Sequence, residues 1–247
     1  MRVAILFSGR INNNIDKYNN YINKLVQNNS VDLFVCHSKT DRKDIITDFI
    51  ELYKPKKIIE NNETFIDLTD YPRVYGTRIY NVLYMFENRL TLFKTFNDYV
   101  IENNVDYDII ISTRADIWLY NTIDFGSLKN FVDNEMLCIP NTKLDSGGIN
   151  DQMAIGNYNT ISIYLQLYTS FFDILKSGVI LHPETILANY LNSIKQNIMR
   201  FEIDYEIKRY GNNDSEPHRS NKPYGNNNSE PSINISSKVY KKTLIYK

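Results

Sequence analysis

The chain has 247 residues, of which 43% are hydrophobic, so it can bury one substantial core, and we expect one folded domain. Its formal net charge of -1 and pI near 6.3 give no overall basic excess, which excludes binding to nucleic acid or to an anionic membrane through bulk charge. No run approaches the ~20 apolar residues that a membrane-spanning helix needs.

The two cysteines, Cys36 and Cys138, lie inside apolar runs, where a thiol usually behaves as a small buried hydrophobic group. This pattern is typical of a reducing compartment. The apolar stretch at residues 3–7 ends at once in Ser8-Gly9-Arg10, without the organisation of a secretory signal. We therefore expect a cytoplasmic protein.

The first half of the chain alternates between strand and helix patterns. Continuous apolar runs at 3–7 and 31–36 predict strands that are covered on both faces. Between them, apolar residues recur at helical spacing from 11 to 26. There follow a helix at 44–53 that stops before Pro55, a short strand at 57–59 and a long loop at 61–77.

The second half continues the alternation. The longest helical pattern runs from 78 to 100, and a buried strand at 107–113 leads directly into Arg114-Ala115-Asp116. Further patterns predict a strand at 136–140 and helices at 158–176 and 183–194. The order predicts an α/β fold, a Rossmann-like mixed and mainly parallel sheet flanked by helices, which binds ligands at the carboxyl ends of its strands.

The composition changes beyond residue 209. Residues 210–217 are nearly repeated at 224–231, with almost no aliphatic side chain in either copy. Such a segment cannot offset its ordering entropy by burial. We expect residues 1–209 to form the domain and residues 210–247 to be a disordered, low-complexity tail with no part in the chemistry.

Asp116 is the first candidate for chemistry, because it follows a strongly apolar strand at the edge where ligands bind. A divalent cation that bridges this carboxylate to phosphate oxygens would satisfy both groups. Arg114, two residues earlier, can donate two hydrogen bonds to the same phosphates. The alternative is a structural pair between Arg114 and Asp116.

The segment 145–152 is the second candidate. The adjacent glycines Gly147 and Gly148 let the backbone approach a ligand, and Asp145 and Asp151 stand on either side of them. The segment reads either as a sugar-binding loop with Asp151 as general base, or as an ordinary turn.

Two histidines and one turn complete the candidates. His182, just before a predicted helix, is a usable metal ligand or a structural residue, and His37 has the same two readings. The Ser8-Gly9-Arg10 turn could place backbone amides near a nucleotide. It lacks the Gly-x-Gly-x-x-Gly fingerprint and the P-loop pattern, which disfavours dinucleotide-binding and P-loop readings.

The order and spacing of these segments resemble the GT-A-type glycosyltransferases, and most of all the small GT-A domains of giant and algal DNA viruses and their bacterial relatives. The resemblance covers about residues 1–205. It rests on residues 8–10, 31–37, 107–116, 147–152 and 182–184. It implies a GT-A-like domain that binds a nucleotide sugar.

The resemblance also implies roles for single residues. In that family an Asp-x-Asp motif after a central strand binds Mn²⁺ or Mg²⁺ and the diphosphate of the donor. Here Arg114 replaces the first Asp, so only Asp116 inherits the metal role, with His182 as the second ligand. Asp151 matches the catalytic acidic residue. The remaining implied contacts are Ser8, Gly9 and Arg10 with the nucleotide, and Asp145, Gly147, Gly148 and Asn150 in the acceptor loop.

Arg78, at the start of the longest helix, is added as a donor contact from its charge and position. The expected function is transfer of a hexose-like sugar from a nucleotide diphosphate donor, UDP-linked, to a glycan or other hydroxyl acceptor. One alternative is a sugar-phosphate nucleotidyltransferase, which should need a more basic glycine-rich loop near the N-terminus. The other is a non-catalytic module that binds nucleotides or glycans through a degenerate site, which the missing first Asp favours.

Overall fold

The structure of the protein is a computed structural model that describes residues 1–11, 20, 23–24, 29–61, 64–74, 77–141 and 148–207. Most of the helix expected at 11–26, the loop residues Asp145 and Gly147, and the tail at 210–247 lie outside the described residues.

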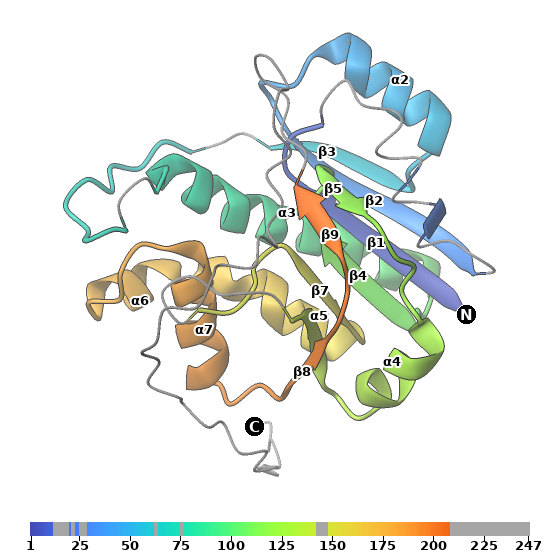
Figure 1. Cartoon of the computed structure of the whole chain (residues 1–247). Helices are drawn as coiled ribbons and strands as arrows, with labels where there is room; N and C mark the ends of the chain where they lie inside the picture. The colour runs from blue at the N-terminus through green and yellow to red at the C-terminus, as the bar shows by residue number, and fades with distance from the viewer. Residues whose placement is uncertain are drawn as a thin grey trace.

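The centre of the fold is a seven-stranded sheet in the order β3-β2-β1-β4-β7-β6-β8 (Figure 1). Strands β3, β2, β1 and β4 are mutually parallel, β7 is antiparallel to both its neighbours, and β8 is parallel to β6. The chain is therefore a mixed, mainly parallel α/β protein, as expected. The strands are β1 Arg2–Ser8, β2 Ser30–Ser38, β3 Lys57–Asn61, β4 Ile109–Thr113, β6 Leu137–Pro140, β7 Met153–Gly156 and β8 Ile198–Phe201.

The apolar runs form strands because both faces of the sheet are covered. In β1, Ala4 and Leu6 belong to the core on one face, whereas Val3, Ile5 and Phe7 belong to the core on the other. The first core includes residues from α3 Ile79–Asn103, α5 Tyr158–Leu165, α6 Phe171–Lys176 and α7 Pro183–Ser193. The second includes residues from α2 Lys43–Tyr53, α4 Phe125–Asp133 and a small antiparallel sheet of β5 Ile117–Leu119 and β9 Tyr205–Ile207.

Most predicted elements have the expected bounds within a few residues, but the single helix at 158–176 was wrong. A 3₁₀ segment, η2 Gln166–Ser170, separates α5 from α6. Within it the side chain of Thr169 donates to the carbonyl of Gln166 at 2.8 Å, and Gln166 donates to the carbonyl of Ser162 at 3.1 Å. Such side-chain bonds to backbone carbonyls compete with a regular helix, and an apolar periodicity does not register them.

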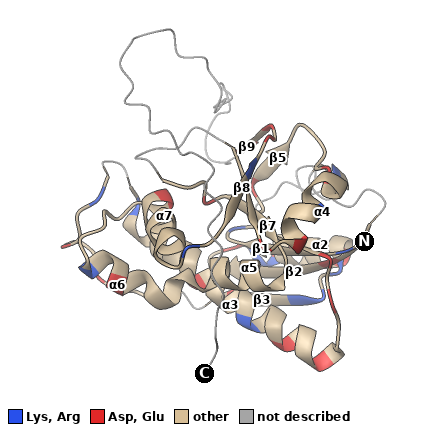
Figure 2. Cartoon of the chain, turned by 90° about the horizontal axis from the view of Figure 1, so that it is seen from below, with Lys and Arg blue, Asp and Glu red and all other residues tan. Residues whose placement is uncertain are grey.

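The sequence patterns also missed β5, α4, β7, β8 and β9, which are short. None of the described helices has the length and apolarity to cross a bilayer. Acidic and basic residues lie together on the described surface, for example on α6, where Lys176 and Asp173 are 3.7 Å apart (Figure 2).

Candidate active site

Three strand ends meet at one edge of the sheet. Phe7 of β1 pairs with Thr113 of β4, and Thr113 pairs with Met153 of β7. Because β7 runs antiparallel, its amino end lies beside the carboxyl ends of β1 and β4 (Figure 1). The register therefore brings the Ser8–Arg10 turn, Arg114–Asp116 and Asp151 to the same edge.

Arg114 and Asp116 form a two-pronged ion pair. Nε of Arg114 donates to Oδ1 of Asp116 at 2.7 Å, and Nη2 donates to Oδ2 at 2.6 Å. The side chains are 25% and 14% exposed, so the pair is partly shielded from water. A planar guanidinium matches a carboxylate in this geometry, which fixes the orientation of both groups. The structural pair that the sequence left open is thus formed.

Arg114 also lies within electrostatic reach of Asp151. Burial alone would lower the pKa of Arg114, but the hydrogen bonds to Asp116 and the charges of Asp116 and Asp151 raise it above its ordinary value. The phenol of Tyr205, in β9, adds to this effect. Arg114 therefore stays protonated and lies near two carboxylates.

Asp151 is 5% exposed, and its main chain is held from two sides. Its carbonyl oxygen accepts a hydrogen bond from the Tyr164 hydroxyl at 3.1 Å and another from Nη2 of Arg89. Within the described part of the chain, no hydrogen bond to the Asp151 carboxylate is found. The hydrogen bonds described for Asp151 therefore hold its main chain.

The side chain of Asn150 serves the fold. Its Nδ2 donates to the Tyr205 hydroxyl at 2.6 Å, and its Oδ1 accepts the amide of Gln152 at 2.9 Å. Asn150 is 2% exposed, so its side chain is shielded from direct contact with a sugar in this conformation. Its contribution to the site is to fix the turn that carries Asp151.

The turn reaches the start of α7 through Gly148. A β-carbon at position 148 would lie 2.5 Å from the carbonyl carbon and the β-carbon of Glu184, closer than real contacts allow. The next amide, that of Ile149, donates to the Glu184 carbonyl at 3.0 Å. Gly148 is thus required by close packing against α7, a reason that differs from the ligand approach expected from the sequence.

His182 is brought close to the same turn, because it is the residue before α7. Its Nδ1 lies 3.1 Å from the Thr185 hydroxyl, and its Nε2 lies 3.7 Å from Oε2 of Glu184. Among the described residues, no hydrogen bond or ion pair joins His182 to Asp116. The role of His182 as a metal ligand therefore stays a prediction.

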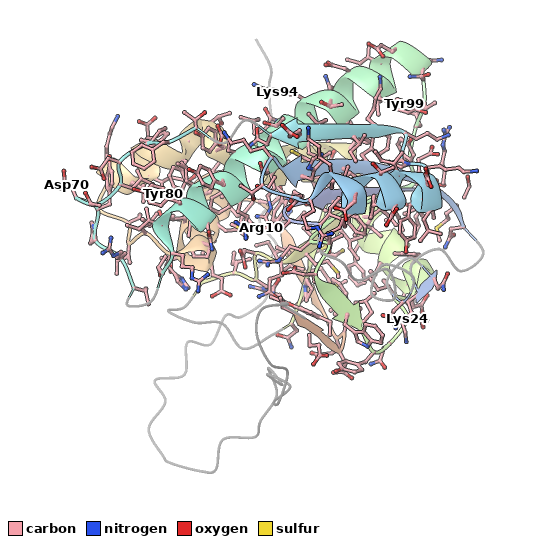
Figure 3. The ribbon with its side chains drawn as sticks, turned by 90° about the horizontal axis from the view of Figure 1, so that it is seen from above. Arg10, Lys24, Asp70, Tyr80, Lys94 and Tyr99 are labelled. Carbon is pink, nitrogen blue, oxygen red and sulfur yellow. The ribbon has the colours of Figure 1, made fainter. Side chains whose placement is uncertain are left out.

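The Ser8-Gly9-Arg10 turn contacts the end of β2, and the residue after the turn contacts the segment that follows β2. Gly9 has φ +117°, a conformation that favours glycine, and its amide donates to the Cys36 carbonyl at 3.0 Å. The amide of Ile11 donates to the buried Asp41 at 3.0 Å. The amide of Gly9 in the turn and that of Ile11 just after it are thus used by the fold, and the side chain of Arg10 is exposed (Figure 3).

Asp41 is a residue that the sequence reasoning missed. Its side chain is 4% exposed and lies 3.7 Å from Nδ1 of His37. Burial raises the pKa of Asp41, while the amide of Ile11 and the charges of His37 and Arg10 oppose the rise. The available signal was the spacing of Asp41, four residues after His37 and just beyond the end of a buried strand.

Arg78 is not brought to this edge by any described contact. It is exposed and precedes the first turn of α3, and no hydrogen bond or ion pair within the described ranges links it to the Ser8–Arg10 turn or to Arg114. In Figure 3, Arg10 lies near the middle of the molecule and Tyr80, in the first turn of α3, lies farther out.

A divalent cation would find only part of a coordination shell here. The described residues contain no group of three or more His, Cys, Asp or Glu side chains that could hold a metal ion. Each oxygen of Asp116 already accepts one N–H of Arg114. Since Mg²⁺ is often held by one or two carboxylates together with substrate phosphates, this donor set fits a cation that arrives with a diphosphate. It does not fit a cation held by the described side chains alone.

No protein-family model and no curated protein sequence matches the chain. Among solved structures, the chain is similar to a "putative nucleotide-diphospho-sugar transferase" from Desulfovibrio desulfuricans G20. The identity is 13%, the similarity covers 81% of this chain and 79% of that chain, and the TM-score is 0.43. A similarity this low cannot carry an assignment of function, so the assignment depends on the site itself.

Proposed function

We propose that the chain is a glycosyltransferase that moves a sugar from a nucleotide diphosphate donor to a hydroxyl acceptor. The observation that carries this proposal is the position of Arg114 at the ligand-binding edge of the sheet, paired with Asp116 and within electrostatic reach of Asp151. Asp116 is hydrogen-bonded to Arg114, and hydrogen bonds hold the main chain of Asp151. A fixed cation and a fixed base at one edge are what transfer from a diphosphate requires.

Arg114 is suited to the diphosphate. Its Nε and Nη2 atoms are oriented by Asp116, and its Nη1 atom makes no hydrogen bond to a described residue. The Nη1 hydrogens can therefore bind phosphate oxygens. Because the guanidinium is held before the donor binds, it can stabilise the negative charge that develops on the leaving diphosphate without reorganising.

Asp151 would act as the general base in an inverting reaction. The acceptor hydroxyl gives its proton to the Asp151 carboxylate while its oxygen forms the new bond to the anomeric carbon of the donor sugar. The bond from that carbon to the diphosphate breaks, and the diphosphate leaves with the electron pair. The short hydrogen-bonded turn around Asn150 and the carbonyl contacts from α3 and α5 would keep the base in place.

The finer parts of the proposal concern donor, cation and acceptor. We propose UDP as the nucleotide, a glycan as the acceptor, and Mn²⁺ or Mg²⁺ as a cofactor that binds together with the donor. Asp116 would be its carboxylate ligand, and the cation would add positive charge at the diphosphate. His182 is the second proposed ligand. Asp145 and Gly147, outside the described residues, stay proposed for the acceptor loop.

A second candidate is a non-catalytic module that binds nucleotides or glycans. The observation that favours it is the Arg114–Asp116 pair, which satisfies both charges without any ligand. Such a module would bind a nucleotide sugar without turning it over.

One assay separates the readings. Wild type, Asp151→Asn and the control Asp173→Asn, whose exposed carboxylate lies on α6, are incubated with a panel of nucleotide sugars in Mn²⁺, Mg²⁺ or EDTA. Anion-exchange chromatography of samples stopped with EDTA follows release of the nucleoside diphosphate. Turnover of one donor by wild type and the control, and not by Asp151→Asn, is the expected result. Binding without turnover of any donor supports the module. In a parallel incubation with a nucleoside triphosphate and a sugar 1-phosphate, consumption of both supports a nucleotidyltransferase.

A further inference from the structure

Arg89 is a buried cation in the middle of α3. It is 1% exposed and is the largest of the fully buried side chains of the described core. Its guanidinium carbon lies 5.1 Å from the centre of the Tyr164 ring and 5.6 Å from that of Phe86. Removing a guanidinium from water costs several kcal/mol, and a methionine or leucine would fill this space without that cost. A charge in such a place therefore calls for a specific partner.

The partner is the main chain of Asp151. Nη2 of Arg89 donates to the Asp151 carbonyl, and the Tyr164 hydroxyl donates to the same oxygen at 3.1 Å. The Nε and Nη1 atoms of Arg89 have no hydrogen-bond partner among the described residues. A buried guanidinium whose sole described acceptor is this carbonyl holds the Asp151 turn at the cost of two unsatisfied nitrogens.

Arg89 and Asp151 both act electrostatically on Tyr164. Burial raises the pKa of Tyr164 to about 12, and the negative charge of Asp151 adds to the rise while the positive charge of Arg89 opposes it. Tyr164 thus lies within electrostatic reach of both charges. Arg114 also lies within electrostatic reach of Asp151.

We infer that Arg89 is a positioning residue of the candidate site: together with Tyr164 it fixes the main chain of Asp151, and so the position from which the Asp151 carboxylate acts. This inference rests on the proposed function, in which Asp151 is the base. Through Arg89, α3 supports the site without contacting the substrate.

The test compares three variants with wild type. Arg89→Met removes the charge and the donors at similar length, Arg89→Lys keeps the charge, and Tyr164→Phe removes one donor to the carbonyl. Donor turnover gives kcat and KM. Amide hydrogen exchange of the peptide that covers residues 148–152 gives a readout that does not depend on activity, with peptides from the rest of α3 and α5 as internal references.

For Arg89→Met we expect kcat to fall at least tenfold with the donor KM within about threefold of wild type, and exchange in 148–152 to rise at least tenfold over the reference peptides. Arg89→Lys should recover part of both losses. Unchanged exchange in 148–152, or an equal rise in all peptides, would overturn the inference. If Arg89→Met does not fold, Tyr164→Phe provides the test. The inference then requires that Tyr164→Phe raises amide exchange in residues 148–152 and not in the reference peptides. If wild type turns over no donor, the proposed function is contradicted. The exchange measurement then still tests whether Arg89 fixes the main chain of Asp151.

Discussion

Gly148 lies so close to the first turn of α7 that a β-carbon at this position would lie 2.5 Å from the carbonyl carbon of Glu184. The contact is with backbone, which cannot move aside as the end of a flexible side chain can. It joins the turn that carries Asp151 to the helix that follows His182. The contact between these two segments of the candidate site therefore depends on the lack of a side chain at position 148.

Gly148→Ala should therefore destabilise the protein by about 2 kcal/mol, the usual range for overpacking, and should also impair the site. Urea denaturation measures the free energy of unfolding. The matched control is Gly126→Ala in α4, where the added carbon meets only the side-chain oxygen of Asp124, at 3.2 Å. A Gly148→Ala variant as stable as the control would contradict the close contact.

Asp116→Ala should remove the Mn²⁺ dependence of UDP binding, because Asp116 is the carboxylate proposed to meet the cation. The change also leaves Arg114 without its partner. We expect a loss of stability of about 2 kcal/mol, between the effects of breaking an exposed pair and a buried pair. Calorimetric titration of UDP with and without Mn²⁺ measures the first effect.

His182→Ala should weaken the Mn²⁺ effect less than Asp116→Ala does, since it removes one ligand and no negative charge. The same titration applies. Metal-dependent binding that is identical in wild type and in Asp116→Ala would exclude Asp116 as the ligand, whatever the result for His182.

Asp151→Asn should bind the nucleotide sugar with near-native affinity and transfer the sugar at least about a hundredfold more slowly. The amide keeps the size of the side chain and cannot take the acceptor proton. Steady-state kinetics with the acceptor and a binding titration with the donor separate the two effects. Transfer within a few-fold of wild type would point to a retaining or substrate-assisted reaction in place of base catalysis by Asp151.

Asp32→Asn should change how stability depends on pH, at the edge of the sheet opposite the candidate site. Asp32 accepts hydrogen bonds from Nη2 of Arg2 at 3.0 Å and from the Tyr107 hydroxyl at 2.8 Å, and Nζ of Lys56 lies 3.4 Å away. Burial alone would raise the pKa of Asp32, but these three groups lower it below the usual 3.8. The stability that they contribute is therefore present above about pH 4 and is lost as the pH falls through the lowered pKa of the folded state.

For this reason wild type should lose stability more steeply than Asp32→Asn as the pH falls below about 4, and at pH 7 the variant should be less stable by on the order of 2 kcal/mol. Thermal unfolding measured from about pH 2 to about pH 8 gives both the slope below pH ~4 and the stability difference at pH ~7. Asp106→Asn, an exposed neighbour of Tyr107, is the control. Parallel curves for wild type and Asp32→Asn would show that the cluster does not stabilise the folded state.

The sequence by itself determined the α/β class, the strands β1, β2 and β4, and the residues at their carboxyl ends. These features are local: a continuous apolar run such as 107–113 can be buried only inside a covered sheet, and whatever follows it must emerge at an edge. Asp116 and the Ser8–Arg10 turn were found in this way.

Only the tertiary structure decided which of these residues meet. The antiparallel direction of β7, which is four residues long, brings Asp151 beside Arg114, and no periodicity in four residues reveals a strand direction. The contact of Gly148 with Glu184 and that of Arg89 with the Asp151 carbonyl join residues 36 and 62 positions apart. A local pattern indicates which face of an element a residue occupies, whereas the packing of whole elements decides which residue it contacts. In the sequence, Arg89 is therefore only one charged residue in a long amphipathic helix.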